Sequence, residues 1–230
     1  MRLLTKLSAL TVLLFSIGCN QKPEESAESP QEAMQKVAQA AGVDGFGSVE
    51  SMSYTFIADL GDKQVVRSWT WLPKSNEVTL KGEAEAEDVR YLRSEVASDE
   101  SGKLETIDQQ FVNDLYWMIF PFQVVWDSSL SIEALPEEAA AVFPDAHAGL
   151  RVRYPEGVGY TPGDVYDLFY DENYQVSHWV FRKGGSEKPT RASEWEDYQS
   201  FGPLSISLNR TSPDSSFRIW FEDVEVELSE

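Results

Sequence analysis

The feature that most constrains this fold is residues 111–127, FVNDLYWMIFPFQVVWD, the most apolar run after the first 18 residues. Ile107, Phe111, Leu115 and Met118 recur at helical spacing, which predicts a helix with a wide apolar stripe packed on a core. The run is too short and too polar to span a bilayer. We therefore expect it to be buried by protein or to line a pocket.

Pro121 lies inside this run. Proline has no amide hydrogen and disfavours the helical conformation of the residue before it. The sequence therefore predicts that the helix ends at about Phe120. The chain is then expected to continue in an extended conformation to Trp126.

The first 18 residues have the features of an export signal. Arg2 and Lys6 are followed by the apolar stretch 7–17 and by Gly18. This segment resembles a bacterial lipoprotein signal, which implies that Cys19 carries acyl chains such as palmitate and becomes the new N-terminus. An ordinary secretory signal, or a buried cysteine, is the alternative. Cys19 is the only cysteine, so a disulfide within the monomer is excluded.

Residues 19–30 are rich in Glu, Ser and Pro and lack aromatic residues, which predicts a flexible tether. The remaining residues, 31–230, are expected to form a single ligand-binding domain. Asn20 follows the cysteine, and the resemblance to Gram-negative lipoproteins implies sorting to the outer membrane. The protein is then expected to be lipid-anchored there and to face the periplasm.

The chain carries a formal net charge of −20, with acidic residues spread along its length. Such a surface repels phosphate backbones, so nucleic acid is excluded as a partner. The distributed acidity is typical of a soluble, self-repelling surface.

From residue 51 onward the apolar pattern changes from a helical period to strict alternation, which predicts antiparallel strands. Residues 164–170 are apolar on both faces, which indicates a central strand covered on one side by helices. The alternation slips near Glu222 and Asp223, which predicts a β-bulge. Short helices are expected near residues 31–41 and 136–142. The fold class is therefore α+β, mainly antiparallel β. The expected strands are 51–60, 64–72, 77–82, 89–93, 150–154, 164–170, 174–182, 204–208 and 217–228.

The chain offers few residues for catalysis. Its two histidines, His147 and His178, lie outside any metal-ligand spacing, and no nucleophile or phosphate-binding motif is present. Asp164 and Asp167 are expected to point to opposite faces of their strand. We therefore expect no metal, no cofactor and no enzymatic activity. Carboxylates brought together by folding remain the alternative.

The aromatic residues are the stronger functional signal. Core packing is the simpler role for each one, but together they would suit a concave sheet that holds a lipid-like ligand beneath a helix. The candidate cavity residues are Trp69, Trp71, Trp117, Phe120, Phe122, Trp126, Tyr166 and Trp179.

Residues 116–127, YWMIFPFQVVWD, and 159–181, GYTPGDVYDLFYDENYQVSHWVF, are similar to passages of uncharacterised lipoproteins. Together with the order of the expected elements, they resemble the periplasmic lipoprotein-carrier (LolA/LolB-like) superfamily. This resemblance implies a curved half-barrel sheet with helices packed in its concave face around an apolar cavity. No functional residue can be carried over from that superfamily.

Three functions remain as hypotheses. The first is a lipid-anchored envelope lipoprotein, a carrier, receptor or sensor that binds a hydrophobic or amphiphilic small molecule or acyl chain. The second is an envelope protein-protein interaction module of the same fold, whose concavity is filled by its own side chains. The third, a carboxylate-dependent hydrolase, lacks a recognisable motif.

Overall fold

The computed structural model describes residues 28–84, 86–143, 145–157 and 160–229. The expected signal peptide, Cys19 and most of the expected tether lie outside these residues. Residues 28–30, the last of the expected tether, are among the described residues. Helix α1 (Pro30–Ala40) begins there because Ser29 and Glu32 form a capping box and Pro30 occupies the first turn.

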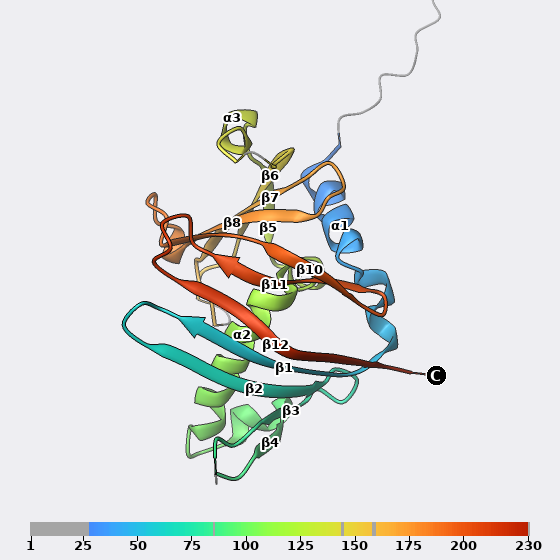
Figure 1. Ribbon diagram of the computed structural model, residues 1–230, viewed down its shortest axis with the longest axis vertical. Coiled ribbons are helices and arrows are strands. Elements are labelled where there is room, and N and C mark those ends of the chain that lie inside the picture. Colours follow the sequence, from blue (N-terminus) through green and yellow to red (C-terminus); the bar gives the residue numbers. More distant parts are fainter. Residues whose placement is uncertain (1–27, 85, 144, 158–159, 230) are drawn as a thin grey trace, which may run out of the picture.

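The strands form two antiparallel sheets, which confirms the α+β, mainly antiparallel fold (Figure 1). The sheets are not closed into a barrel, consistent with a curved half-barrel. In spatial order, the seven-stranded sheet contains β10 (Glu196–Phe201), β11 (Leu204–Thr211), β12 (Arg218–Leu228), β1 (Val49–Asp59), β2 (Gln64–Leu72), β3 (Glu77–Leu80) and β4 (Val89–Leu92). The five-stranded sheet contains β5 (Ser131–Ala134), β6 (Ala148–Arg153), β7 (Val165–Tyr170), β8 (Val176–Arg182) and β9 (Arg191–Glu194).

The longest helix, α2 (Lys103–Trp126), lies behind the seven-stranded sheet in Figure 1. Its apolar stripe, including Phe111, Leu115 and Met118, is buried in the main core, as the sequence predicts. The smaller helical segments are α3 (Glu137–Ala140), η1 (Val43–Ser48), η2 (Arg93–Ser98) and η3 (Lys183–Gly185). None of the described helices combines the length and apolar character needed to cross a membrane.

The predicted helix end at Phe120 is wrong. The helix bends at Ile119, where φ is −123° and ψ is 32°, and then continues to Trp126. The bend places Pro121 at the start of a new helical segment, where a missing amide hydrogen is tolerated. In a regular helix, residue 121 would donate to the carbonyl oxygen of Trp117. Here the Nη2 atom of Arg210 donates to that oxygen at 2.5 Å.

Two finer predictions are confirmed. The pairing of β1 with β12 shifts register between Ser53, opposite Glu225, and Thr55, opposite Glu222, so β12 contains the expected bulge. Strand β7 is buried along its whole length. One of its faces joins the main core, and the other lies in a second cluster near α3, where Phe143 and Phe169 have ring centroids 4.5 Å apart.

Candidate functional site

An open cleft of about 760 Å³ lies between the two sheets, beside the N-terminal half of α2. The seven-stranded sheet contributes inward-facing residues of β1, β2 and β12, because alternate residues of a strand share one face. The five-stranded sheet contributes residues of β7, β8 and β9, and residues 160–162 and 164 complete the lining. The apolar and aromatic lining consists of Phe56, Ala58, Leu60, Val65, Val112, Tyr116, Trp117, Tyr160, Pro162, Tyr166, Trp179, Phe181 and Ile219.

Stacked aromatic rings form one wall of the cleft. Trp117 of α2 and Trp179 of β8 lie nearly parallel, with ring centroids 4.5 Å apart and an interplanar angle of 6°. Tyr166 meets Trp179 edge-on at 5.1 Å and stacks on Phe181 at 5.0 Å. Burial raises the pKa of Tyr166, so its hydroxyl stays neutral. The wall is therefore a rigid, uncharged surface suited to apolar groups.

The polar residues at the cleft include one charge that is already neutralised. Arg67 donates from Nε and Nη2 to the two carboxylate oxygens of Asp114, at 2.7 and 2.6 Å. The indole of Trp69 also donates to Asp114, at 2.9 Å. Because Asp114 has no solvent exposure, this bidentate pair fixes α2 against β2. The other polar and charged lining residues are Glu105, Gln109, Asn113, Thr161, Asp164 and Arg191.

Tyr160 lines both this cleft and a second pocket of about 280 Å³, as Val112, Tyr116 and Thr161 also do. Its hydroxyl donates to Asp108 of α2 at 3.0 Å. Asp108 is also held by Arg93, in a bidentate pair, and by the hydroxyl of Tyr91. Partial burial and the hydrogen bond to Asp108 raise the pKa of Tyr160 to about 12.

The structure brings three of the eight sequence-predicted aromatic residues to the cleft, namely Trp117, Tyr166 and Trp179. The other five lie elsewhere. Four of them, Trp69, Trp71, Phe120 and Phe122, are buried in the main core and do not line the cleft. The three cleft residues, at 7, 5 and 3% exposure, are also part of that core and reach the cleft only at its wall.

Trp126 is the fifth of these and is 43% exposed; its ring packs on Phe46 at a centroid distance of 4.8 Å. The continued helix explains part of this placement, because it carries Phe120 and Phe122 into the core and Trp126 towards the surface. Several cleft residues were not candidates from the sequence, among them Phe56, Val112 and Ile219. Phe56 and Ile219 could have been identified, because the alternation of their strands places them on the inward face. Nothing in the sequence indicated that Tyr160 would line the cleft.

The buried carboxylates form salt bridges with arginines. Asp108 and Asp114 are paired as described, and Asp167 accepts from Arg151 and Arg182. Asp164, in contrast, accepts from the backbone of Gly184. Within the described residues, no group of three or more His, Cys, Asp or Glu side chains is arranged to hold a metal ion.

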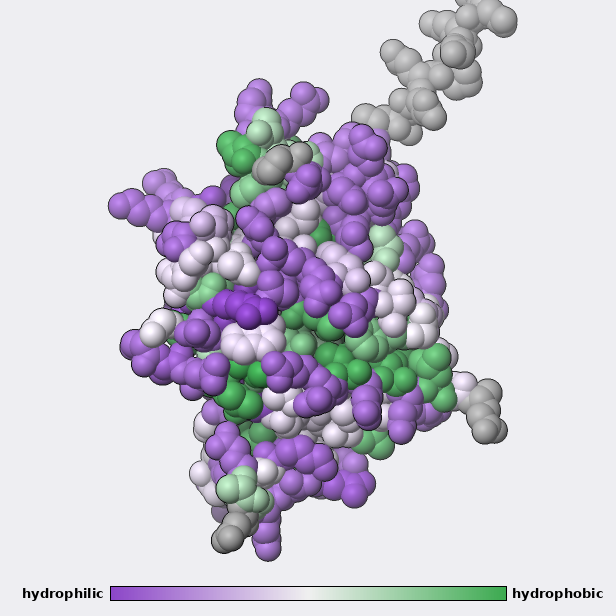
Figure 2. Space-filling view, in the orientation of Figure 1, coloured by the Kyte–Doolittle hydropathy of each residue, from purple (hydrophilic) through white to green (hydrophobic). Residues whose placement is uncertain are grey.

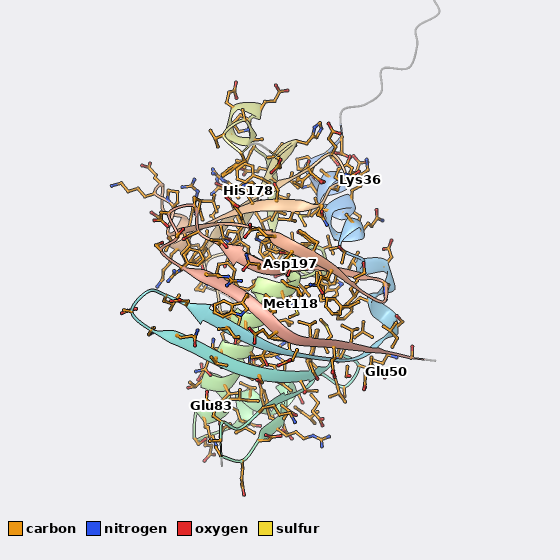
Figure 3. All side chains as sticks on the ribbon, in the orientation of Figure 1. Lys36, Glu50, Glu83, Met118, His178 and Asp197 are labelled. Atoms are coloured by element: carbon orange, nitrogen blue, oxygen red, sulfur yellow. The ribbon has the colours of Figure 1, made fainter. Side chains whose placement is uncertain are left out.

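His178 lies on β8 (Figure 3) and does not line the cleft. Because neighbouring residues of a strand point to opposite faces, it faces away from the side that carries Trp179. Its ring stacks on Phe143 at 4.4 Å, and its Nδ1 atom is 3.0 Å from the Ser177 hydroxyl. Burial lowers the pKa of His178. The residue therefore has the environment of a packed, neutral strand residue.

No protein-family model matches the chain, and no curated protein matches it. Among the solved structures that resemble this chain, two illustrate the weak likeness. A DUF1329 family protein from Desulfovibrio piger has a TM-score of 0.45 and 11% identity, covering 87% of this chain and 94% of its own. A protein described as an outer membrane lipoprotein-sorting domain, from Vibrio parahaemolyticus, has a TM-score of 0.46 and 9% identity, covering 86% and 92%.

Proposed function

We propose that this chain is a lipid-anchored protein of the bacterial envelope that holds a hydrophobic or amphiphilic molecule, such as an acyl chain, in the cleft. It acts as a carrier, receptor or sensor and performs no chemistry on that molecule. The single observation that carries the proposal is the open cleft of about 760 Å³ walled by the stacked rings of Trp117 and Trp179.

The size and lining of the cleft support this function. Small-molecule sites commonly have volumes of roughly 300 to 1,000 Å³ and are mostly apolar with a few polar groups. Here apolar side chains come from both sheets and α2, and Glu105, Asp164 and Arg191 add charge to the lining. An amphiphile would place its apolar part on the aromatic wall and leave its polar part in water.

The interaction module remains the second candidate, because part of the concavity is filled by the protein itself. Phe120 and Phe122 are 0% and 1% exposed, and the space beside the C-terminal part of α2 is only about 10 Å³, about the size of one water. The cleft beside Trp117 is the feature that favours a ligand over this second candidate.

A cleft-filling variant tests the proposal. Val65 lines the cleft, whereas its neighbour Val66 lies on the opposite face of β2 and is 40% exposed. The full chain, purified from a bacterial envelope in detergent, is examined by native mass spectrometry and lipid extraction. We expect the wild type and Val66→Trp to retain a stoichiometric amphiphile, and Val65→Trp to retain at least fivefold less.

Equal retention by Val65→Trp and the wild type would place the ligand outside the cleft. A wild-type chain that stays empty after envelope lipids are offered would favour the interaction module. Thermal melting of each variant shows whether lost retention reflects lost folding.

The proposed anchor has a separate test. Replacing Cys19 with serine removes the thiol that lipidation requires, so the protein should move from the membrane pellet to the soluble fraction. Asn20→Asp should keep the lipid but hold the protein at the inner membrane. A Cys19→Ser variant that still sediments with membranes would show that the anchor is elsewhere.

A further inference from the structure

The two strands β11 and β12 pair over only a short part of their lengths. Their register joins Asn209–Thr211 to Arg218–Trp220 and then stops, although β12 continues to Leu228. Figure 1 shows the two strands separating beyond this point. On its other side, β12 pairs with β1 along nearly its whole length. The outer edge of residues 221–228 therefore faces no strand within the described part of the chain.

The facing edge of β11 is different, because the protein itself supplies partners for two of its backbone groups. The amide of Ser205 donates to the carbonyl of Ala41 at 2.9 Å. The carbonyl of Ser207 accepts from Nη1 of Arg210 at 2.8 Å. Among the described residues, no comparable bond reaches the backbone of 222–228 apart from the β1 ladder. Within the described residues, the edge of β12 therefore lacks the bonds that the protein supplies to these two positions of β11.

The side chains of this edge alternate between apolar and acidic. Val224 and Val226 are half-buried against the core, and Leu228 is 41% exposed. Figure 2 shows a hydrophobic band across the molecule where this part of β12 lies, bordered by hydrophilic surface. A partner strand placed beside β12 would therefore meet apolar contacts as well as backbone hydrogen bonds.

The acidic side chains of the edge are Glu222, Asp223, Glu225 and Glu227. In the described part of the chain, no Lys or Arg nitrogen lies within 4.0 Å of these carboxylates. Glu227 accepts only from the Ser51 hydroxyl and Glu222 from the Trp220 indole. Four uncompensated carboxylates on one strand favour a basic partner.

We propose that the outer edge of β12, residues 221–228, pairs with an extended segment of a partner protein in which apolar and basic residues alternate. An unpaired strand edge is a template for such strand addition, in which backbone bonds give affinity and side chains give specificity. A second copy of this chain is disfavoured, because edge-to-edge pairing would bring like charges together across the strands. At about 3.3 Å per residue, the edge accepts roughly eight residues.

A designed peptide tests this inference. The probe is an end-blocked, fluorescent octapeptide of alternating valine and lysine, added to the full chain in detergent and followed by fluorescence anisotropy. One control replaces each lysine with glutamate; another keeps the lysines but carries N-methyl groups on alternate backbone amides. We expect saturable binding of the lysine peptide, at least tenfold weaker binding of both controls, and slower hydrogen exchange confined to residues 221–228.

A charge reversal locates the site. The variant Glu225→Lys with Glu227→Lys should bind the lysine peptide at least tenfold more weakly and the glutamate peptide more tightly. The matched control, Glu137→Lys with Glu138→Lys, makes the same charge change on the exposed helix α3 and should bind as the wild type does.

Three outcomes would overturn the inference. If the N-methylated peptide binds equally well, the attraction is electrostatic without strand pairing. An equal loss in the α3 control would mean that net charge alone decides binding. No binding of the lysine peptide would mean that the carboxylates only keep other strands away from this edge.

Discussion

The two parts of α2 have similar aromatic content but different surroundings. After the bend at Ile119, Pro121 and Phe122 border a space with room for about one water, which α1 and β11 also border, and Phe120 is fully buried. Before the bend, Val112, Tyr116 and Trp117 border a cleft of about 760 Å³. The difference lies in what covers the helix, since α1 contributes nothing to the cleft. Aromatic content alone therefore does not indicate a ligand site; the second layer of packing decides.

The largest expected effect tests the filled part of the helix. Phe120→Ala should lower the free energy of unfolding by about 3 to 5 kcal/mol, because it leaves a void in a fully buried position. Val112→Ala, at the cleft, should cost about 1 kcal/mol, because solvent already reaches this side chain. Chemical denaturation of the full chain measures both values. Equal costs for the two variants would erase the distinction between the filled and open parts.

The bend that separates the two parts has its own test. Arg210→Met removes the donor to the Trp117 carbonyl and should cost about 1.5 to 3 kcal/mol. In a Pro121→Ala background, residue 121 regains an amide hydrogen that can serve this carbonyl, so the cost of Arg210→Met should fall by about 1 kcal/mol. A double-mutant cycle measures this coupling. The same cost in both backgrounds would show that Arg210 does not compensate for the proline.

A third measurement concerns His178 of β8, which lies outside both parts of α2. Because burial lowers the pKa of His178, the unfolded chain binds a proton at a higher pH than the folded chain does. The free energy of unfolding should therefore fall as pH drops below about 6.5, by at most about 1.4 kcal/mol per pH unit. His178→Gln should remove this slope, while the exposed His147→Gln serves as the control. A slope that survives in His178→Gln must come from another group.

The smallest expected effect is at Trp126. Trp126 is a cavity candidate from the sequence, and a core position would make Trp126→Ala cost about 3 to 5 kcal/mol. At 43% exposure, with ring contacts to Phe46 and Phe122, it should cost only about 1 kcal/mol. Thermal or chemical melting tests this value, and a loss above 3 kcal/mol would show that the tryptophan is buried in solution.

Much of the β-structure could be predicted because its signals are local. The alternation from Met52 to Ala58 predicted the inward face of β1, and the parity slip near Glu222 predicted the bulge in β12. The helix end at Pro121 could not be predicted by a local rule. The conformation around Pro121 also involves Arg210, 89 positions further along the chain. Arg210 donates to the Trp117 carbonyl oxygen, which the proline leaves without an amide partner.

The candidate site was less predictable than the fold. The sequence identified aromatic residues, but only tertiary packing shows that Trp179 lines the cleft and Trp69 does not, although both side chains are buried. The bond from Tyr160 to Asp108 joins a loop to a helix across 52 positions and has no local signature. The free edge of β12 likewise depends on where β11 turns away, which neither strand's own pattern shows.

The pairing of β1 with β12 sets the order in which the molecule can be completed. These strands lie near opposite ends of the domain's sequence, yet they are neighbours in the middle of the seven-stranded sheet. When the chain is synthesised or exported N-terminus first, Val49–Asp59 has no such partner until Arg218–Leu228 has emerged. Until then, one edge of β1 stays open to incorrect pairing. A chain truncated before Arg218 should therefore be prone to aggregation rather than simply shorter.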